Sequence, residues 1–467
     1  MCQRAWATTA ATIAPVLRLP SGLRPRPLDR EVARLAVPAF AALVAEPLFL
    51  LADSAVVGSL GVVPLAGLGA AGTVLTTAVG VFVFLAYATT AAVARRLVAD
   101  DLPAALRQGV DGMWLALVLG VVTAAAAWPL ARDLALALGT SPEVADAAAT
   151  YLRASLPGLP AMLVVLAATG VLRGLQDTRT PLVVAVSGAL VNVPLNVVLV
   201  LGPGPFPALG IAGSGLGTAA AQLGMATALV VVVVRGARRH GVPLAPGGAG
   251  VLRSARDGVP LLARTLTLRA TLLLTTAAAA RSGDTALAAH QVVVTIWSAL
   301  ALGLDALAIA GQALTGRTLG AGDVAATRDV LRRLVGWGAV LGVLSGVVVL
   351  AGRDLVAPLF SPDDGVRTAI AAALVVVALA QPLAAYVFVL DGVLIGAGDG
   401  RYLAVAGLVG LVAYAPLVVA VVTWAPQGAA GLVWLWVAFA GGFMAVRAVT
   451  LWHRARGDAW AVTGAVR

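Results

Sequence analysis

Two acidic side chains stand inside the first long apolar run of this sequence. Glu46 and Asp53 are seven residues apart, which is two turns of an α-helix, so both would lie on one face. A carboxylate at bilayer depth costs several kcal/mol unless it faces protein or water, so an acid in such a place is a functional candidate. We therefore interpret Asp53, and after it Glu46, as residues that carry chemistry. The alternative for both is a structural ion pair between helices.

Amide and hydroxyl side chains in two later apolar runs could surround such an acid. Asn192 and Asn196 are four residues apart and share a helix face. The next run carries Ser214, Thr218 and Gln222. These groups hydrogen-bond a carboxyl group in its charged or its protonated form, as a proton-coupled carrier requires of an acid whose charge changes during transport. The alternative is that they only hold helices together by interhelical hydrogen bonds.

The second half of the chain has different polar residues in its apolar runs. They are Arg264, Arg269, Asp305, Gln312, Gln381 and Asp391. Arginines at this depth should pair with acids, and Glu46, Asp305 and Asp391 are available, so a structural role is expected for the pairs. We keep the whole set, together with Glu46 and Phe49, as candidates for the wall of a substrate cavity.

The composition is that of an integral membrane protein made of helices. The chain has 467 residues, of which 60% are hydrophobic and 12% charged, and its mean hydropathy is +0.97. Soluble proteins are roughly 45–50% apolar and about 25% charged. Cys2 is the only cysteine, which excludes an intrachain disulfide and a cysteine metal cluster. The three histidines are far apart in the sequence, so we expect no metal site and no cofactor beyond a coupling ion.

Apolar runs bounded by charge, Pro or Gly predict twelve transmembrane helices. They lie near residues 33–57, 63–93, 110–131, 147–172, 181–201, 209–234, 255–280, 286–315, 331–351, 368–396, 402–424 and 429–450. Arginines gather in alternate connections and at the two ends, and we assign Arg95, Arg173, Arg317 and Arg447 to that group. Since basic loops stay in the cytoplasm, both termini are expected there, in a bacterial inner (plasma) membrane. This placement explains the net charge of +10 without a nucleic-acid partner.

The chain contains an internal repeat with an offset of 222 residues. The segment GVLRGLQD at 170–177 matches GVLIGAGD at 392–399, and Pro160 falls on Pro382. Six spans in each repeat is an even number, so both halves enter the membrane in the same orientation, as in carriers built from two parallel lobes. Asp53 falls on Thr275 at this offset, so the coupling chemistry is expected in the first half.

The expected domain organisation follows from the repeat. Residues 1–30 form a disordered cytoplasmic tail, 31–240 the N-terminal six-helix lobe, 241–252 a cytoplasmic linker, 253–454 the C-terminal six-helix lobe, and 455–467 a cytoplasmic tail. The fold class is therefore an all-α integral membrane protein of twelve transmembrane helices in two lobes.

Several segments resemble a known family of transporters. LADSAVVG at 51–58, followed by LAGLG at 65–69, resembles the first-helix motif of multidrug and toxic compound extrusion (MATE) transporters. GVLRGLQDTRTP at 170–181 resembles their motif between helices 4 and 5. LAAHQ at 287–291 and DGVLIGAGD at 391–399 are similar to the DinF-like branch. The resemblance implies a twelve-helix antiporter that exports organic, often cationic, compounds against inward H⁺ or Na⁺.

The resemblance also implies roles for individual residues. Asp53 matches the ion-coupling aspartate of the N-terminal lobe, Asn192 and Asn196 match polar residues of helix 5, and Thr218 matches a threonine of helix 6. Two positions depart from the family: a tyrosine often found one turn before the aspartate is Phe49, and an acid often found in helix 5 is Asn196. Fewer acids make a poorer Na⁺ site, so we expect H⁺ coupling and keep Na⁺ as the alternative.

Three other functions are alternatives to an H⁺-coupled exporter, and the first, a purely structural or receptor role, leaves Asp53 unexplained. A flippase for lipid-linked precursors shares the wider superfamily fold, but its cavity should be lined by several basic residues, and only Arg264 and Arg269 qualify. An enzyme is not expected, because the sequence has no acids paired with metal-ligand histidines, no Ser/His arrangement and no phosphate loop. The expected partners are small organic substrates and membrane lipid, and a pathway inside one chain needs no second copy, so we expect a monomer.

Overall fold

The computed structural model describes residues 27–98, 101–203 and 205–464, and this part of the chain is almost wholly helical. Its elements are α2 (Pro27–Gly58), α3 (Val62–Val81), α4 (Phe84–Val98), α5 (Leu102–Leu136), α6 (Pro142–Ser155), η2 (Leu156–Gly158), α7 (Leu159–Gly174), α8 (Arg179–Leu201), α9 (Ile211–Arg239), α10 (Gly248–Arg281), α11 (Asp284–Gly320), α12 (Val324–Phe360), α13 (Asp364–Gly396), α14 (Gly400–Trp424), α15 (Ala429–Trp436), η3 (Val437–Phe443) and α16 (Met444–Arg456). The predicted all-α fold is confirmed.

Each of the twelve predicted spans coincides with one helix or with consecutive helical segments. In the part of the chain that the structure describes, eleven spans are long and apolar enough to cross a membrane. The twelfth is α10, whose apolar character is diluted by arginines such as Arg264 and Arg269. Three spans are irregular in ways that the sequence analysis did not predict: turn residues separate α3 from α4, a 3₁₀ turn separates α6 from α7, and the last span contains a π-helical stretch, η3.

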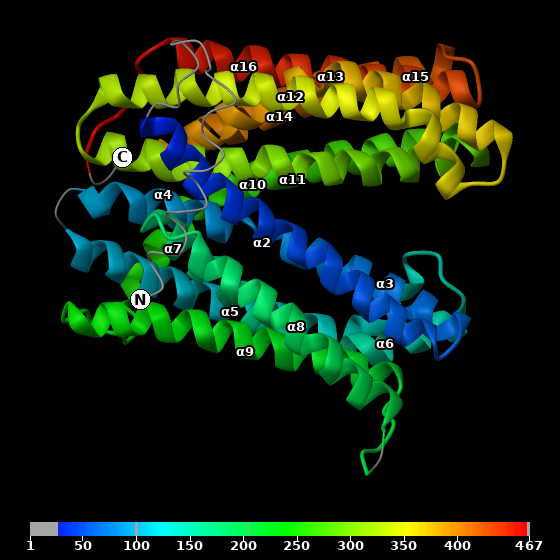
Figure 1. The fold of residues 1–467 in the computed structure, drawn as a ribbon, viewed down its shortest axis with the longest axis horizontal. Coiled ribbons are helices and arrows are strands. Elements are labelled where there is room, and N and C mark those ends of the chain that lie inside the picture. Colours follow the sequence, from blue (N-terminus) through cyan, green and yellow to red (C-terminus); the bar gives the residue numbers. More distant parts are fainter. Residues whose placement is uncertain (1–26, 99–100, 204, 465–467) are drawn as a thin grey trace, which may run out of the picture.

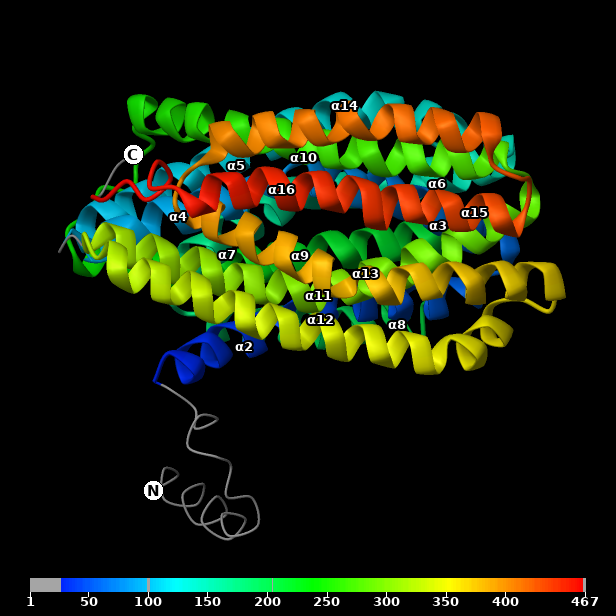
Figure 2. The ribbon, with the colours of Figure 1, turned by 90° about the horizontal axis from the view of Figure 1, so that it is seen from above.

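The helices form two lobes, α2–α9 and α10–α16, which lie one above the other in Figure 1. Turned by 90°, the same helices run roughly parallel along the long axis (Figure 2). The end of α4, the turn from α11 to α12 and the end of α16 all lie at one end of the bundle, on the left in Figure 1. We call this the arginine-rich end, because Arg95, Arg317, Arg333 and Arg454 lie there.

The boundaries of the expected tails and linker differ in detail from the structure. The expected tail 1–30 lies mostly outside the described residues, and its last four residues already belong to α2. The expected linker 241–252 ends inside α10, which begins at Gly248. The expected C-terminal tail is folded back as far as it is described, because Trp460 is fully buried and its indole N–H donates to Ala455 O at 3.0 Å.

The repeated motif is explained by close helix packing in both lobes. A Cβ at Gly170 or Gly174 of α7 would overlap the backbone or side chains of α4, such as Ala86 and Val93. The repeat equivalents on α13 do the same against α11, because a Cβ at Gly392 would overlap Ala308 and one at Gly396 would overlap Gln312. Small residues at such contacts let two helices approach closely in a membrane. The glycines of the motif are therefore packing residues.

The lobes are tied together at the arginine-rich end by the first helix. α2 runs diagonally between the lobes in Figure 1. At its start, Asp29 and Glu31 form ion pairs with Arg333 of α12 and Arg317 of α11, and Trp337 Nε1 donates to Asp29 at 2.9 Å. Its other end packs against helices of the N-terminal lobe.

A second tie runs through Arg95 of α4. Its guanidinium donates to Ala397 O at 2.7 Å, to Val462 O at 3.0 Å and to Gly464 O at 3.1 Å, all in the C-terminal half of the chain. Gly464 N in turn donates to Leu319 O at 3.0 Å. Arg95, predicted to lie in a connecting loop, is instead a buried residue at the end of α4 that bonds to the other lobe.

These ties predict which cysteine pairs can be cross-linked. In a Cys2→Ser background, which removes the native thiol, cysteines at Glu31 and Arg317 should react together with a short bis-maleimide, because the two native side chains touch. Cysteines at Glu31 and Ser54 serve as the control, since 23 residues along α2 separate them by about 35 Å. Peptide mass spectrometry measures the cross-link. Equal cross-linking of both pairs would contradict the described arrangement.

Candidate functional site

Asp53 is buried in the N-terminal lobe and accepts hydrogen bonds from two neighbouring helices. Its side chain comes from α2, and the residue is 1% exposed. Asn196 Nδ2 of α8 donates to Asp53 Oδ1, and Thr218 Oγ1 of α9 donates to Asp53 Oδ2 at 3.2 Å. Asn196 Nδ2 also donates to Asn192 Oδ1 at 3.2 Å. The structure thus brings together the four residues that the sequence predicted to be neighbours, with neutral donors around a single carboxyl group.

Tyr151 completes this cluster and was missed by the sequence analysis. It comes from α6, is 2% exposed, and its hydroxyl lies 3.1 Å from Thr218 Oγ1. Tyr151 therefore contacts the residue that holds Asp53 without touching the acid itself. A lone tyrosine in an alanine-rich segment carries no spacing pattern, so nothing in the sequence singled it out.

The packing around the amides leaves polar atoms without a partner. Asn196 Oδ1, Asn192 Nδ2 and Ser214 Oγ are buried and make no hydrogen bond among the described residues. Gly217 lies directly against Asn196, so that a Cβ there would overlap the amide oxygen. The site therefore has free hydrogen-bonding capacity next to the acid, which a proton, an ion or a rearranged neighbour can use.

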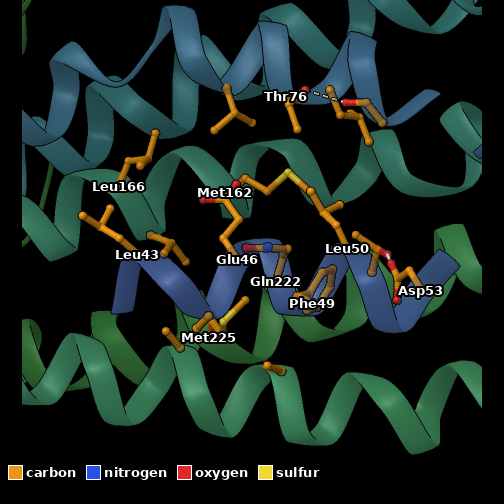
Figure 3. A pocket seen from close by; sticks show the side chains of 18 of the residues that line it. Leu43, Glu46, Phe49, Leu50, Asp53, Thr76, Met162, Leu166, Gln222 and Met225 are labelled. Atoms are coloured by element: carbon orange, nitrogen blue, oxygen red, sulfur yellow. Dashed lines mark hydrogen bonds between the residues drawn. The ribbon is translucent and has the colours of Figure 1, made fainter. Parts of the chain in front are cut away.

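Asp53 lies in the wall of a cavity of about 470 Å³ within the N-terminal lobe. Figure 3 shows Glu46, Phe49, Leu50 and Asp53 following one another along α2, with Met162 and Leu166 of α7 across the cavity. The remaining lining is mostly apolar and includes Leu43, Thr76, Gln222 and Met225. Glu46 makes no ion pair among the described residues. The two acids of the first apolar run therefore face one space.

The equivalent positions of the C-terminal lobe contain a different chemistry. Thr275 stands at the repeat position of Asp53, and Tyr414 at that of Asn192. Their hydroxyl groups lie 2.7 Å apart, so the contact between the two helices is kept while the acid is lost. Tyr414, Trp436, Phe439 and Phe443 pack against one another with ring centroids 5.5–6.2 Å apart. Aromatic side chains thus fill the place that the polar cluster around Asp53 occupies in the N-terminal lobe.

Asp391 lies at the centre of a buried charge cluster in the C-terminal lobe. It forms ion pairs with Arg264 and, at 2.6 Å, with Arg447. The pairing of Arg264 with Asp391 is the kind expected from the sequence. Arg447, which the sequence analysis assigned to the chain end, is 2% exposed because α16 carries it into the lobe. Asp305 of α11 interacts electrostatically with Arg264, with Arg173 and with the hydroxyl of Tyr87.

The other predicted cavity residues lie apart from the cavity around Asp53. Arg269 of α10 reaches across to Gly80 of α3, where a Cβ would overlap its guanidinium. Gln312 and Gln381 are each 1% exposed, and Gln381 Oε1 lies 3.5 Å from Ser345 Oγ. Only Glu46 and Phe49 of the predicted substrate residues line the cavity. Among the described residues, no group of three or more His, Cys, Asp or Glu side chains could hold a metal ion.

Comparison with known proteins agrees with these features. Residues 38–198 and residues 260–420 each match the MatE family, so that the second match begins 222 residues after the first. Protein DETOXIFICATION 44, chloroplastic, from Arabidopsis thaliana is 31% identical over 80% of this chain and 73% of its own length. DNA damage-inducible protein F from Escherichia coli is 28% identical over 79% of this chain and 81% of its own length. A solved MOP superfamily transporter from Pyrococcus furiosus has a TM-score of 0.80 at 21% identity, over 94% of this chain and 97% of its own.

The two buried aspartates should differ in their contribution to stability. Asp391→Asn leaves two buried guanidinium groups without their counter-charge and should lower the free energy of unfolding by roughly 3–5 kcal/mol. Asp53→Asn removes a carboxyl group that is held by neutral donors, and it should change the free energy of unfolding by less than about 1 kcal/mol. Thermal unfolding of both purified variants in detergent measures this difference. A larger loss for Asp53→Asn would contradict the structural role given to the arginine cluster.

Proposed function

Because the chain belongs to the MatE family of membrane transporters, we propose that it is a secondary active exporter that exchanges organic compounds for protons through Asp53. Members of this family are transporters and not enzymes. The observation that carries the proposal is the burial of Asp53 among neutral donors in the wall of a cavity large enough for a small organic molecule. A buried acid of this kind lies where charge is costly, which favours a group that gains and loses a proton during transport.

The shared cavity supports exchange of a substrate for a proton. Asp53 and Glu46 face the same apolar space, so a cationic substrate in that space is attracted by a deprotonated acid. Protonation of the acid removes the attraction and favours release of the substrate. Competition of this kind for one carboxyl group is sufficient to couple the two movements.

The donors around Asp53 support H⁺ in preference to Na⁺. The amide nitrogen of Asn196 and the hydroxyl of Thr218 both present hydrogens to the carboxyl oxygens. A hard cation needs several oxygen ligands, of which carboxylates contribute most, and this cluster holds one carboxylate. The unpartnered Asn196 Oδ1 is the feature that would favour Na⁺.

The position of the protein in the cell belongs to the same proposal. We place the arginine-rich end on the cytoplasmic side of a bacterial inner membrane, with both termini there, since basic connections are retained in the cytoplasm. The cavity lies within one lobe of one chain, which supports a monomer that acts on small organic substrates in contact with membrane lipid.

Reconstituted protein tests the proposal directly. Proteoliposomes carrying a fluorescent organic cation should show transport under an imposed pH gradient, and Asp53→Asn should reduce it to the level of empty vesicles. The Asp53→Asn protein, checked for normal folding, is compared with the wild type. Full activity of the variant would contradict the role of Asp53.

A Na⁺ gradient applied without a pH gradient distinguishes H⁺ coupling, Na⁺ coupling and the flippase alternative. Transport driven only by Na⁺ would replace H⁺ as the coupling ion and leave the exporter intact. Absence of dye movement under either gradient would contradict the exporter and favour a lipid-linked precursor as substrate.

Tyr151→Phe should weaken transport without abolishing it. The variant removes one hydrogen bond to Thr218 but leaves the bond from Thr218 to Asp53. A net hydrogen bond is worth about 0.5–1.5 kcal/mol, so the rate under a pH gradient should fall roughly two- to tenfold. Tyr386→Phe, on α13 in the other lobe, is the control and should be neutral. An unchanged transport rate in Tyr151→Phe would show that the Tyr151 hydroxyl does not contribute to the site around Asp53.

A further inference from the structure

Arg173 lies in the wall of the cavity, although the sequence analysis assigned it to a loop. It is the next-to-last residue of α7 and is 8% exposed. Met162, Leu166 and Thr169 line the same cavity and precede Arg173 at helical spacing, so Arg173 ends the face of α7 that borders this space. The guanidinium is thus held nine-tenths buried at the end of the cavity toward the arginine-rich end.

The guanidinium of Arg173 makes no hydrogen bond and no ion pair among the described residues. Arg264 Nε and Arg447 Nη1 also lack partners, but they are sealed from solvent. No nitrogen of Arg173 is sealed in this way, and Arg173 lines the cavity. Asp305 of the other lobe offsets its charge electrostatically but lies beyond ion-pair distance. A buried guanidinium with five donors therefore borders the cavity while none of its donors is used in a hydrogen bond among the described residues.

The repeat shows that the fold does not need a charge at this position. Arg173 corresponds to Ile395 in the second copy of the motif, between Gly392 and Gly396, which pack against α11 as Gly170 and Gly174 pack against α4. Ile395 is 2% exposed within the C-terminal lobe. Ile395 thus fills in the C-terminal lobe the place that Arg173 has in the N-terminal lobe, so helix packing alone does not require an arginine there. Burying the guanidinium of Arg173 costs desolvation free energy, which indicates that the side chain has a binding role.

The charged residues of the cavity are arranged by sign. Its lining holds three of them, namely Glu46 and Asp53 on α2 and Arg173 at the end of α7. α2 runs away from the arginine-rich end, so Asp53 lies near the far end of the cavity, and Arg173 lies near the opposite end. A cation binds best near the acids, whereas an acidic group binds best beside the guanidinium, in bidentate geometry with a carboxylate.

We propose that Arg173 is a specificity-determining residue that binds a carboxylate of the substrate, so that the cavity prefers compounds carrying both a cationic centre and an acidic group. The inference rests on the proposed export function and names the class of substrate for it. Zwitterionic organic compounds satisfy both ends of the cavity, while purely cationic ones leave Arg173 without a partner.

A pair of dyes that differ by one methyl group tests the proposal. Rhodamine 110 carries a free carboxylate, and rhodamine 123 is its methyl ester. Transport of each is measured in proteoliposomes under the gradient that drives the wild type, for wild-type protein, Arg173→Ile and Arg173→Lys. Arg173→Ile introduces the residue that the repeat uses, and Arg173→Lys keeps the charge without the planar fork.

The expected result is a selective loss. Wild type should transport rhodamine 110 in preference to its ester, Arg173→Ile should lower rhodamine 110 transport about tenfold or more while leaving rhodamine 123 within about twofold, and Arg173→Lys should lie between. Equal loss of both dyes in the two variants, or wild-type transport of the ester alone, would overturn the inference and leave the exporter standing. Failure of wild type to move either dye would overturn the proposed function itself.

Thermal unfolding shows whether a variant is folded. If Arg173→Ile does not fold, Arg173→Gln replaces it in the same comparison, and an unchanged preference for rhodamine 110 in that variant overturns the inference.

Discussion

The cost of charge away from water organises the polar interior of this molecule. Asp53 is surrounded by hydrogen-bond donors and Asp391 is paired with arginines, because an uncompensated charge at this depth costs several kcal/mol. Asp391 forms ion pairs with two guanidinium groups, those of Arg264 and Arg447. Asp53 accepts hydrogen bonds from neutral donors and has no arginine partner among the described residues. The same physical cost is thus met by ion pairs in one lobe and by neutral hydrogen-bond donors in the other.

The two lobes share packing contacts and differ in chemistry. The glycine pairs on α7 and α13 hold equivalent helices together, and the contact between Asp53 and the α8 amides has its counterpart in Thr275 and Tyr414. In the C-terminal lobe, aromatic rings fill the region that is a polar cluster in the N-terminal lobe. The two copies of the repeat thus share close backbone approach at the glycines and differ in the side chains that stand at the position of Asp53.

The sequence predicted the fold from hydropathy and the internal repeat, and it predicted the centre of the site because its motifs resemble those of a known family, which placed Asn196 and Thr218 near Asp53. Hydropathy placed the twelve spans, the 222-residue offset placed the two lobes, and helical periodicity put Glu46 and Asp53 on one face. Loop charge misplaced Arg95, Arg173 and Arg447, because these arginines lie near helix ends where the sequence cannot show whether a side chain turns toward water or into the protein. Tyr151 could not be predicted, since neither a motif nor a helical spacing in the sequence connects it with Thr218, which it contacts in the folded chain.

The contact between α4 and α11 has a mechanical consequence. A Cβ at Gly316 would lie 2.8 Å from that of Ala94, and one at Gly320 would overlap the backbone of Arg95, so the two lobes meet here as smooth backbone surfaces. Surfaces of this kind have no interdigitated side chains that must change rotamer before they separate. At this joint the hydrogen bonds of Arg95 to the C-terminal half of the chain are the specific contacts that must break before α4 and α11 separate. Close backbone contact and a small set of breakable hydrogen bonds thus occur together where the lobes meet.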